Sequence, residues 1–182
     1  ILLGYFLIIS LNVLYLLNDS IIFIDQNLFK IIIISLITLL VFNFFSLIIA
    51  GDAGAYVLGL FFSYLLINFS NQNVNISPIY ILNLLWYPAF ENLFSILRKI
   101  RKNTPISSPD NLHLHHLIFK KFFNKNNKNK FNNSITGLFI NLFNFTTIAI
   151  ATLVANHSLY LVIILSFNIL VYCSTYYLLS QD

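Results

Sequence analysis

Charged residues are scarce in this sequence, and that scarcity excludes an ordinary soluble domain. Only 9% of the 182 residues are charged, while 58% are hydrophobic. A soluble domain carries about 25% charged residues. The single cysteine, Cys173, excludes an intrachain disulfide and is interpreted as a small buried or lipid-facing side chain. The composition indicates a protein that crosses the membrane several times.

Methionine is absent altogether, and residue 1 is an isoleucine. We therefore expect that the native translation start is missing and that the chain is an internal or C-terminal part of a longer protein. No tail is long enough to form a second domain, so residues 1–182 are expected to form a single transmembrane domain.

Long apolar runs make up most of the chain, and about 20 apolar residues suffice for a helix to cross a bilayer. Six runs qualify: 1–18, 29–50, 53–69, 78–97, 135–156 and 158–179. Backbone polar groups in lipid must be satisfied within the segment, so these runs are expected to be helices. The sequence thus predicts an all-α, polytopic integral membrane protein with about six transmembrane helices.

Basic residues concentrate in one connection. The loop 98–134 contains nine of the ten lysines and arginines, and the positive-inside rule places it in the cytoplasm. Alternation along the chain then assigns the connections 19–28, 70–77 and 156–158 to the opposite face. The connection that contains Asp52 is expected on the same face as the basic loop.

The basic loop carries a helix start signal. Ser108 suits an N-cap, Pro109 suits the first helical position, and Asp110 complements the helix dipole. We therefore expect a helix from Pro109 to about Phe123. Its apolar residues predict one amphipathic cytoplasmic helix lying along the membrane surface.

Three of the four histidines, His113, His115 and His116, fall in this segment. A regular helix puts His113, His116 and Lys120 on one stripe and points His115 well away from it. Either His115 then packs structurally, or the helix is irregular there. Imidazole and ammonium groups on one stripe suit a diphosphate. A structural zinc site and a pH-sensitive surface helix are the alternatives.

Asp52 lies where two apolar segments meet, among the small residues Gly51, Ala53 and Gly54. A carboxylate at membrane depth is costly and indicates function. A lone carboxylate is also a natural ligand for Mg²⁺, which keeps several waters and takes phosphates as further ligands. The alternative is an N-cap for a helix that starts at Ala53.

Glu91 lies near the cytoplasmic end of the 78–97 run, three residues after Pro88, which is expected to kink the helix. We favour an ion pair of Glu91 with Arg98 or with a lysine of the basic loop over a direct substrate role. Arg98 and Arg101 suit either lipid headgroups or a phosphate clamp.

Three blocks of sequence carry a resemblance. They are Phe42-Asn43-Phe44 leading to Gly51-Asp52-Ala53-Gly54; Tyr87-Pro88-Ala89-Phe90-Glu91-Asn92-Leu93-Phe94-Ser95-Ile96-Leu97-Arg98-Lys99; and Ser108-Pro109-Asp110 followed by His113-Leu114-His115-His116-Leu117. The blocks resemble the polyprenyl-phosphate N-acetylhexosamine-1-phosphate transferases, the membrane enzymes of glycosyltransferase family 4. The resemblance spans roughly residues 29–123, and the His-x-His-His pattern is similar to the branch that transfers N-acetylglucosamine 1-phosphate.

The resemblance implies a reaction and its participants. A polyprenyl phosphate, usually undecaprenyl phosphate in bacteria, attacks the β-phosphorus of a UDP-N-acetylhexosamine, and uridine monophosphate leaves. Mg²⁺ is the implied cofactor, and the product starts a cell-envelope polysaccharide such as O-antigen. The implied site residues are catalytic Asp52, also the magnesium ligand, catalytic His116, and substrate-binding His113, His115, Arg98, Arg101 and Lys120. The expected location is the bacterial inner membrane with a cytoplasmic active face. A homodimer is compatible with this reading, and no nucleic acid is expected as a partner.

Two departures from the family pattern bear on activity. The adjacent aspartate pair and the Asn-x-x-Asn-x-x-Asp-Gly segment of the family's N-terminal half do not occur here, and Ala55 stands where a serine is usual. We therefore expect the 182-residue chain alone to be inactive and its full-length parent to be active. A degenerate scaffold, or a fragment of a transporter or channel, are the competing interpretations.

Overall fold

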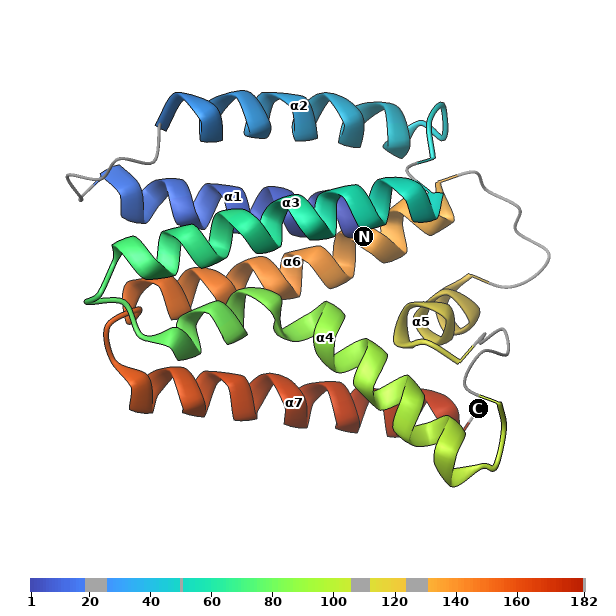
Figure 1. Ribbon diagram of the computed structural model, residues 1–182. Helices are drawn as coiled ribbons and strands as arrows, with labels where there is room; N and C mark the ends of the chain where they lie inside the picture. The colour runs from blue at the N-terminus through green and yellow to red at the C-terminus, as the bar shows by residue number, and fades with distance from the viewer. Residues whose placement is uncertain (19–25, 50, 106–111, 124–130, 182) are drawn as a thin grey trace.

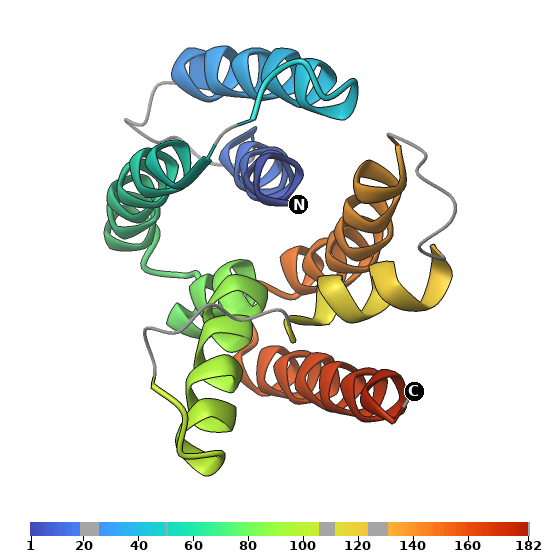
Figure 2. The same cartoon turned by 90° about the vertical axis from the view of Figure 1, so that its right-hand side faces the viewer.

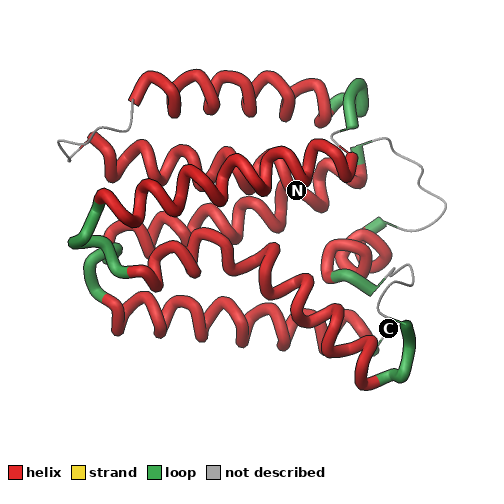
Figure 3. Tube along the Cα trace, in the orientation of Figure 1, coloured by secondary structure: helices red, strands yellow, loops and turns green. Residues whose placement is uncertain are grey.

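The computed structural model describes every residue except 19–25, 50, 106–111, 124–130 and 182. In the described residues seven helices follow one another: α1 (Leu2–Asn18), α2 (Gln26–Phe44), α3 (Gly51–Gln72), α4 (Pro78–Arg101), α5 (Leu114–Phe122), α6 (Asn132–Leu153) and α7 (Ser158–Ser180). Figure 3 shows helices joined by loops, and no strand among the described residues. The predicted all-α class is confirmed.

Six long helices lie side by side, and the short α5 lies across them at one end of the bundle (Figures 1 and 2). The same end holds the start of α3, the end of α4, the start of α6 and the end of α7. The turns that join α3 to α4 and α6 to α7 lie at the opposite end. The topology therefore gathers the first turn of α3 and the histidine segment at one end, in agreement with the alternation expected from the sequence.

Apolar surface covers the outside of the bundle. The helices α2, α3, α6 and α7 are long and apolar enough to cross a membrane, and Leu2–Leu17 is a shorter apolar helix. Large hydrophobic side chains point outward from them, for example Ile31 and Ile34 on α2 and Leu60 on α3. Such a surface suits contact with lipid hydrocarbon. The chain is a multi-pass membrane protein, as predicted. Among the described residues, however, four helices are long and apolar enough to span where about six were expected, because α1 is short and α4 is more polar.

The core is built around α1, which packs against α2, α3 and α6. Ile9 and Val13 on this helix are fully buried. Neutral polar side chains connect the helices at depth: the Thr152 hydroxyl lies 3.0 Å from the Tyr80 hydroxyl and donates to Asn12 Oδ1 at 2.9 Å. Hydrogen bonds between side chains help transmembrane helices to associate, so these contacts stabilise the arrangement of α1, α4 and α6.

The helix α4 begins with a regular cap and then bends. Ser77 is its N-cap and accepts a backbone N–H through its side chain, and Pro78 follows at the first helical position. Pro88 lacks the N–H that would bond the Leu84 carbonyl, and Figure 1 shows α4 changing direction midway along its length. The Tyr5 hydroxyl of α1 donates to that carbonyl instead, at 2.9 Å. The predicted kink is present, and the carbonyl that it leaves without a partner within α4 is satisfied by a neighbouring helix.

Candidate functional site

The three histidines converge at the start of α5. The ring centroids of His113 and His115 lie 5.6 Å apart, those of His113 and His116 lie 6.3 Å apart, and those of His115 and His116 lie 4.2 Å apart. His115 therefore lies beside the other two rings, in agreement with the expected alternative that the helix is irregular at this point. The three imidazoles are close enough together for one ligand at this end of the bundle to contact all of them.

The reason is where the helix starts. The described helix begins at Leu114 rather than at Pro109, and His113 precedes it in an extended conformation with φ −66° and ψ 149°. Helical geometry therefore does not set the angle between His113 and the other rings. The expected cap residues Ser108, Pro109 and Asp110 lie outside the described residues. The His113 side chain makes no capping hydrogen bond to its own helix.

Glu91 provides the missing cap from another helix. Its Oε1 accepts a hydrogen bond from the Leu114 backbone N–H at 2.9 Å and lies 3.0 Å from His113 Nδ1. The Glu91 side chain is 9% exposed, and the His113 side chain is 24% exposed. The pairing that we expected with Arg98 or with a lysine is therefore replaced by a pairing with His113, because the first residues of the α5 segment reach Glu91.

Arg98 holds the other end of the same short segment. Its Nη1 donates to the Leu112 carbonyl at 3.0 Å and to the Tyr176 hydroxyl of α7 at 3.0 Å, and its Nη2 donates to Ser95 at 3.3 Å. The guanidinium also lies over the Tyr176 ring, 5.5 Å from its centroid, a favourable cation–π arrangement. Arg98 thus connects α4, α7 and the segment that leads into α5.

The remaining cationic residues of the predicted site, Arg101 and Lys120, lie at more exposed positions than Arg98. Arg101, at the end of α4, is exposed and borders an open groove of about 600 Å³ together with Arg98 and Tyr176. Lys120 is exposed in the last turn of α5. The structure therefore places Arg101 and Lys120 at the same end of the bundle as the histidines, in positions that solvent reaches.

A cavity of about 470 Å³ with a partly polar wall lies beside His115. Its wall comes from α1, the end of α2, the bend of α4, α5 and the start of α6, and it includes Asn43, Ser46, His115, Asn133 and Ser134. Burial, and then the nearby charge of His116, lowers the pKa of His115 to about 4. His115 is therefore neutral at pH 7 and offers one donor and one acceptor to a ligand.

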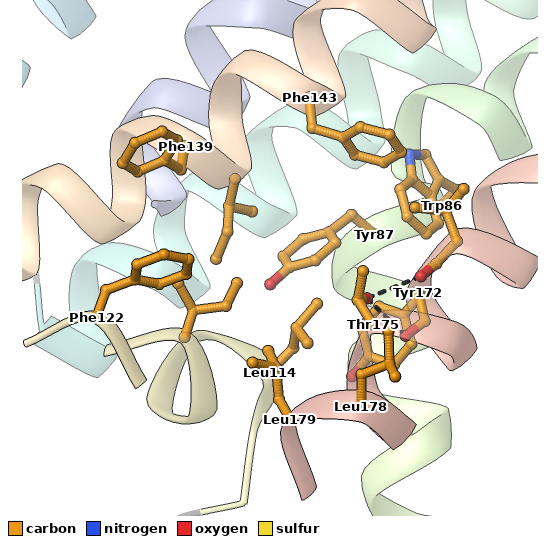
Figure 4. Close-up of a pocket in the computed structure, with 13 residues that line it drawn as sticks. Trp86, Tyr87, Leu114, Phe122, Phe139, Phe143, Tyr172, Thr175, Leu178 and Leu179 are labelled. Carbon is orange, nitrogen blue, oxygen red and sulfur yellow. Dashed lines mark hydrogen bonds between the residues drawn. The ribbon is translucent and has the colours of Figure 1, made fainter. Parts of the chain in front are cut away.

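A second cavity, of about 430 Å³, lies on the other side of Tyr87 and is almost entirely apolar. Aromatic and aliphatic side chains of α4, α5, α6 and α7 line it (Figure 4). Tyr87 borders both cavities, and Figure 4 shows its hydroxyl directed into the apolar one. Within the described residues this hydroxyl and Trp86 Nε1 have no hydrogen-bond partner. The site thus joins a polar chamber to an apolar chamber across one tyrosine.

Asp52 lies in the first turn of α3, and its side chain is exposed. The helix begins at Gly51, whose φ of 61° lies in the left-handed region that favours glycine. Asp52 is therefore inside the helix rather than its N-cap, which corrects the capping alternative. It lines neither cavity. The structure brings Asp52 to the same end of the bundle as the histidines without placing it against them.

The alternative of a structural zinc site finds no support in the described part of the chain. No group of three or more His, Cys, Asp or Glu side chains there has an arrangement that could hold a metal ion. The histidines are gathered, but their rings are not arranged as a ligand set. A single exposed carboxylate such as Asp52 suits a different ion, one that keeps most of its waters.

One comparison with known proteins agrees with the resemblance in the sequence. A Bacillus subtilis (strain 168) protein described as a probable undecaprenyl-phosphate N-acetylglucosaminyl 1-phosphate transferase is 34% identical over 90 residues. The match covers 48% of this chain and only 25% of the relative. No family model and no solved structure matches the chain. The chain is thus a distant and partial homologue of a membrane transferase.

Sequence reasoning missed the roles of Glu91 and Tyr176. Glu91 and Arg98 are seven residues apart, a spacing that puts both on one face of a helix. That spacing was visible in the sequence and could have suggested a shared partner. The contribution of Tyr176 had no such signal, because nothing in the local sequence of α7 indicates that its end packs beside α4.

Proposed function

We propose that this protein contributes to the transfer of an N-acetylhexosamine 1-phosphate, in particular N-acetylglucosamine 1-phosphate, from a UDP-sugar to a polyprenyl phosphate. A phosphate oxygen of the lipid forms a bond to the β-phosphorus of the nucleotide sugar. The bond from that phosphorus to the bridging oxygen breaks, and uridine monophosphate leaves. The observation that carries the proposal is the convergence of three imidazoles, one of which, His115, lines a partly polar cavity that shares Tyr87 with an apolar cavity.

The two chambers suit the two substrates. The partly polar cavity beside His115 has amide, hydroxyl and imidazole groups that fit a nucleotide sugar. The apolar cavity between α4, α5, α6 and α7 fits part of an isoprenoid chain. Because Tyr87 borders both, the phosphate of a lipid lying in the apolar cavity would come close to the histidine segment. This arrangement favours contact between the reacting groups.

The histidines and nearby cations have distinct proposed roles. His116 is exposed and is proposed to act directly on the reacting phosphates, whereas His113 and His115 bind the diphosphate. Arg101 and Lys120 add positive charge where solvent enters, and Arg98 contributes from the edge of the open groove. Positive groups at such positions stabilise the negative charge of the transferring phosphoryl group.

Asp52 is the residue that would hold Mg²⁺. Its exposed carboxylate lies among small residues in the first turn of α3, a setting that fits an ion coordinated mainly by water and phosphate. When bound, the ion would offset negative charge on the diphosphate. The active face is proposed to be the cytoplasmic face of a bacterial inner membrane, because the basic residues collect at this end.

The distribution of charge favours a transport function less than it favours the transferase function. Among the Asp, Glu, Lys and Arg residues that the structure describes, only Glu91 is buried. An ion or proton path needs ionisable groups at depth along several helices. Here the polar groups at depth are neutral asparagine, serine, threonine and tyrosine side chains that bond neighbouring helices.

The test is an assay of the full-length protein in membranes. We expect Mg²⁺-dependent release of uridine monophosphate from UDP-N-acetylglucosamine and undecaprenyl phosphate. Asp52→Asn and His116→Ala should each lower the rate by about 100-fold or more, as removal of groups that act on transition-state charge does. His157→Ala, at the opposite end of the bundle, is the matched control and should leave the rate unchanged. Absence of release from every UDP-N-acetylhexosamine tested would contradict the proposal.

A further inference from the structure

One carboxylate oxygen takes two hydrogen bonds at the entrance to α5. Oε1 of Glu91 accepts the Leu114 backbone N–H at 2.9 Å and lies 3.0 Å from His113 Nδ1. An ionised carboxylate accepts hydrogen bonds and donates none. The contact with His113 therefore requires the imidazole proton to reside on Nδ1.

The position of that proton decides what the other ring nitrogen does. With the proton on Nδ1, Nε2 of the neutral ring is an acceptor, and it becomes a donor only when the ring is protonated. The partner of one imidazole nitrogen sets the tautomer and the ring orientation in this way at many functional sites. Because the His113 side chain is 24% exposed, a ligand can approach the ring from the open side.

The contact is more than a helix cap. Neutral side chains of Ser, Thr and Asn cap helices well, so a cap alone does not require a buried charge. A buried carboxylate is costly unless it is paired, and Glu91 is the one buried side chain among the described acidic and basic residues. Its Oε2 has no hydrogen-bond partner within the described residues. The carboxylate is therefore stabilised by the His113 imidazole and the Leu114 N–H at Oε1, with the Tyr172 hydroxyl also close to it.

Arg98 completes the mounting of this segment. It donates to the Leu112 carbonyl at 3.0 Å. The segment is therefore bound to α4 at Leu112 by Arg98 and at His113 and Leu114 by Glu91. The two α4 residues are seven positions apart and share a helix face. The position of the His113 ring is thus fixed by its own contact with Glu91 and by backbone hydrogen bonds of the residues before and after it.

We propose that Glu91 is a positioning residue that keeps the His113 proton on Nδ1 and thereby presents Nε2 to the phosphates of the substrate. The proposal rests on the proposed transferase function for the nature of the ligand. The geometry of the pair itself is independent of that function, so the two are tested separately.

The first test reads the tautomer without any assay of activity. The protein is labelled with ¹⁵N-histidine in lipid nanodiscs, and the imidazole ¹⁵N shifts report which nitrogen carries the proton. The His113 signal is assigned by its loss in His113→Gln. We expect a protonated Nδ1 in the unmodified protein and a mixture of tautomers in Glu91→Gln, because the new amide can either accept from Nδ1 or donate to it. A proton on Nε2 in the unmodified protein would overturn the proposal.

The second test compares Glu91→Gln with Glu91→Ala in the full-length protein in membranes. Loss of a partner that orients a functional histidine typically costs about 10- to 100-fold. We expect Glu91→Gln to lower kcat by this factor with little change in KM, and Glu91→Ala to lower it further because the Leu114 N–H also loses its acceptor. Asn92→Ala, an exposed neighbour on α4, is the control and should match the unmodified protein.

The outcomes separate the two proposals. If Glu91→Gln keeps full kcat, Glu91 is only a cap and the positioning role is wrong. If the unmodified protein releases no uridine monophosphate, the transferase function is wrong, and the ¹⁵N shifts alone then decide whether Glu91 fixes the His113 proton.

Discussion

The two halves of α4 on either side of Pro88 differ in chemistry and in partners. The first half buries Tyr80, Asn83 and Leu84, and its polar side chains are neutral. Asn83 donates to the Leu161 carbonyl of α7 at 3.1 Å, which joins two helices at depth. The second half carries Glu91 and the basic residues of the last turn. Glu91 and Arg98 hold the segment that leads into α5, and Arg98 also donates to the Tyr176 hydroxyl of α7.

The comparison shows that the bend at Pro88 divides α4 into two parts with different roles: the first part packs in the bundle, and the second part carries the charged residues of the site. Before the bend, side chains that are neutral can be buried in the bundle at low cost. After the bend, charged side chains reach the end of the bundle, where a short helix and solvent are available as partners. Changes before Pro88 should therefore affect stability, and changes after it should affect activity.

The largest expected effect comes from a charge placed in the first half. Asn83→Asp replaces the amide donor to Leu161 with a carboxylate at a fully buried position. A buried charge without a partner destabilises by roughly 3–5 kcal/mol, so the bundle should unfold much earlier in a denaturation series in detergent. Asn83→Leu is the control and should cost less than about 1 kcal/mol, since no charge is buried. Equal stability of the two variants would contradict the distinction between the halves.

The next effect comes from the second half. Arg98→Ala removes the donor to the Leu112 carbonyl and to the Tyr176 hydroxyl. We expect a loss of about 10- to 100-fold in transferase rate, the usual cost of losing a residue that orients functional side chains. Hydrogen exchange at the start of α5 should accelerate while α1 remains protected. Unchanged exchange in α5 would show that Arg98 does not hold this segment.

A smaller effect is expected at the bend itself. Tyr5→Phe removes the hydroxyl that donates to Leu84 O and that accepts the Tyr87 N–H at 3.4 Å. We expect a loss of about 1 kcal/mol in stability, typical of one buried hydrogen bond, measured by thermal denaturation in detergent. The rate per folded molecule should stay near that of the unmodified protein. A large fall in rate with no loss of stability would mean that Tyr5 serves the site rather than the bend.

The last effect, which is absent near pH 7, is a pH dependence at His115 on α5. The pKa of His115 is lowered from 6.5 to about 4, first by burial. Between these two values the unfolded chain binds a proton that the folded chain excludes, so stability falls as pH drops through this window and is unaffected above it. NMR titration of His115 should give a midpoint near 4. A midpoint near 6.5 would show that the ring is solvated.

The sequence predicted the parts of the fold that depend on local pattern. Apolar runs of sufficient length located α1, α2, α3, α4, α6 and α7, and Pro88 located the bend because the missing N–H is a property of that residue alone. The grouping of Asp52 with the histidine segment at one end followed from alternation of the spans. Each of these inferences needed only neighbouring residues.

The sequence did not predict the geometry of the histidines, because contacts between distant segments determine it. The start of α5 depends on Glu91, which is 23 residues away from Leu114. Local signals at Ser108 to Asp110 favoured an earlier start, and they carry no information about α4. The direction expected for His115 assumed a regular helix from that earlier start. The wrong start of the helix therefore also gave a wrong position for the ring. Six helices together line the two cavities, so no local stretch of sequence could have indicated them.

The hydrogen bond between Tyr5 and Leu84 has a consequence for biosynthesis. Its partners are 79 residues apart in sequence, and chains fold from the N-terminal side as they are made. The ribosome therefore delivers α1 to the membrane well before α4 exists. During that interval the tyrosine hydroxyl lacks its final acceptor, and the hairpin of α1 and α2 is an unfinished intermediate. Insertion of the bent helix α4 supplies that acceptor, and the environment of α1 is complete only when α6, which also packs on it, has followed.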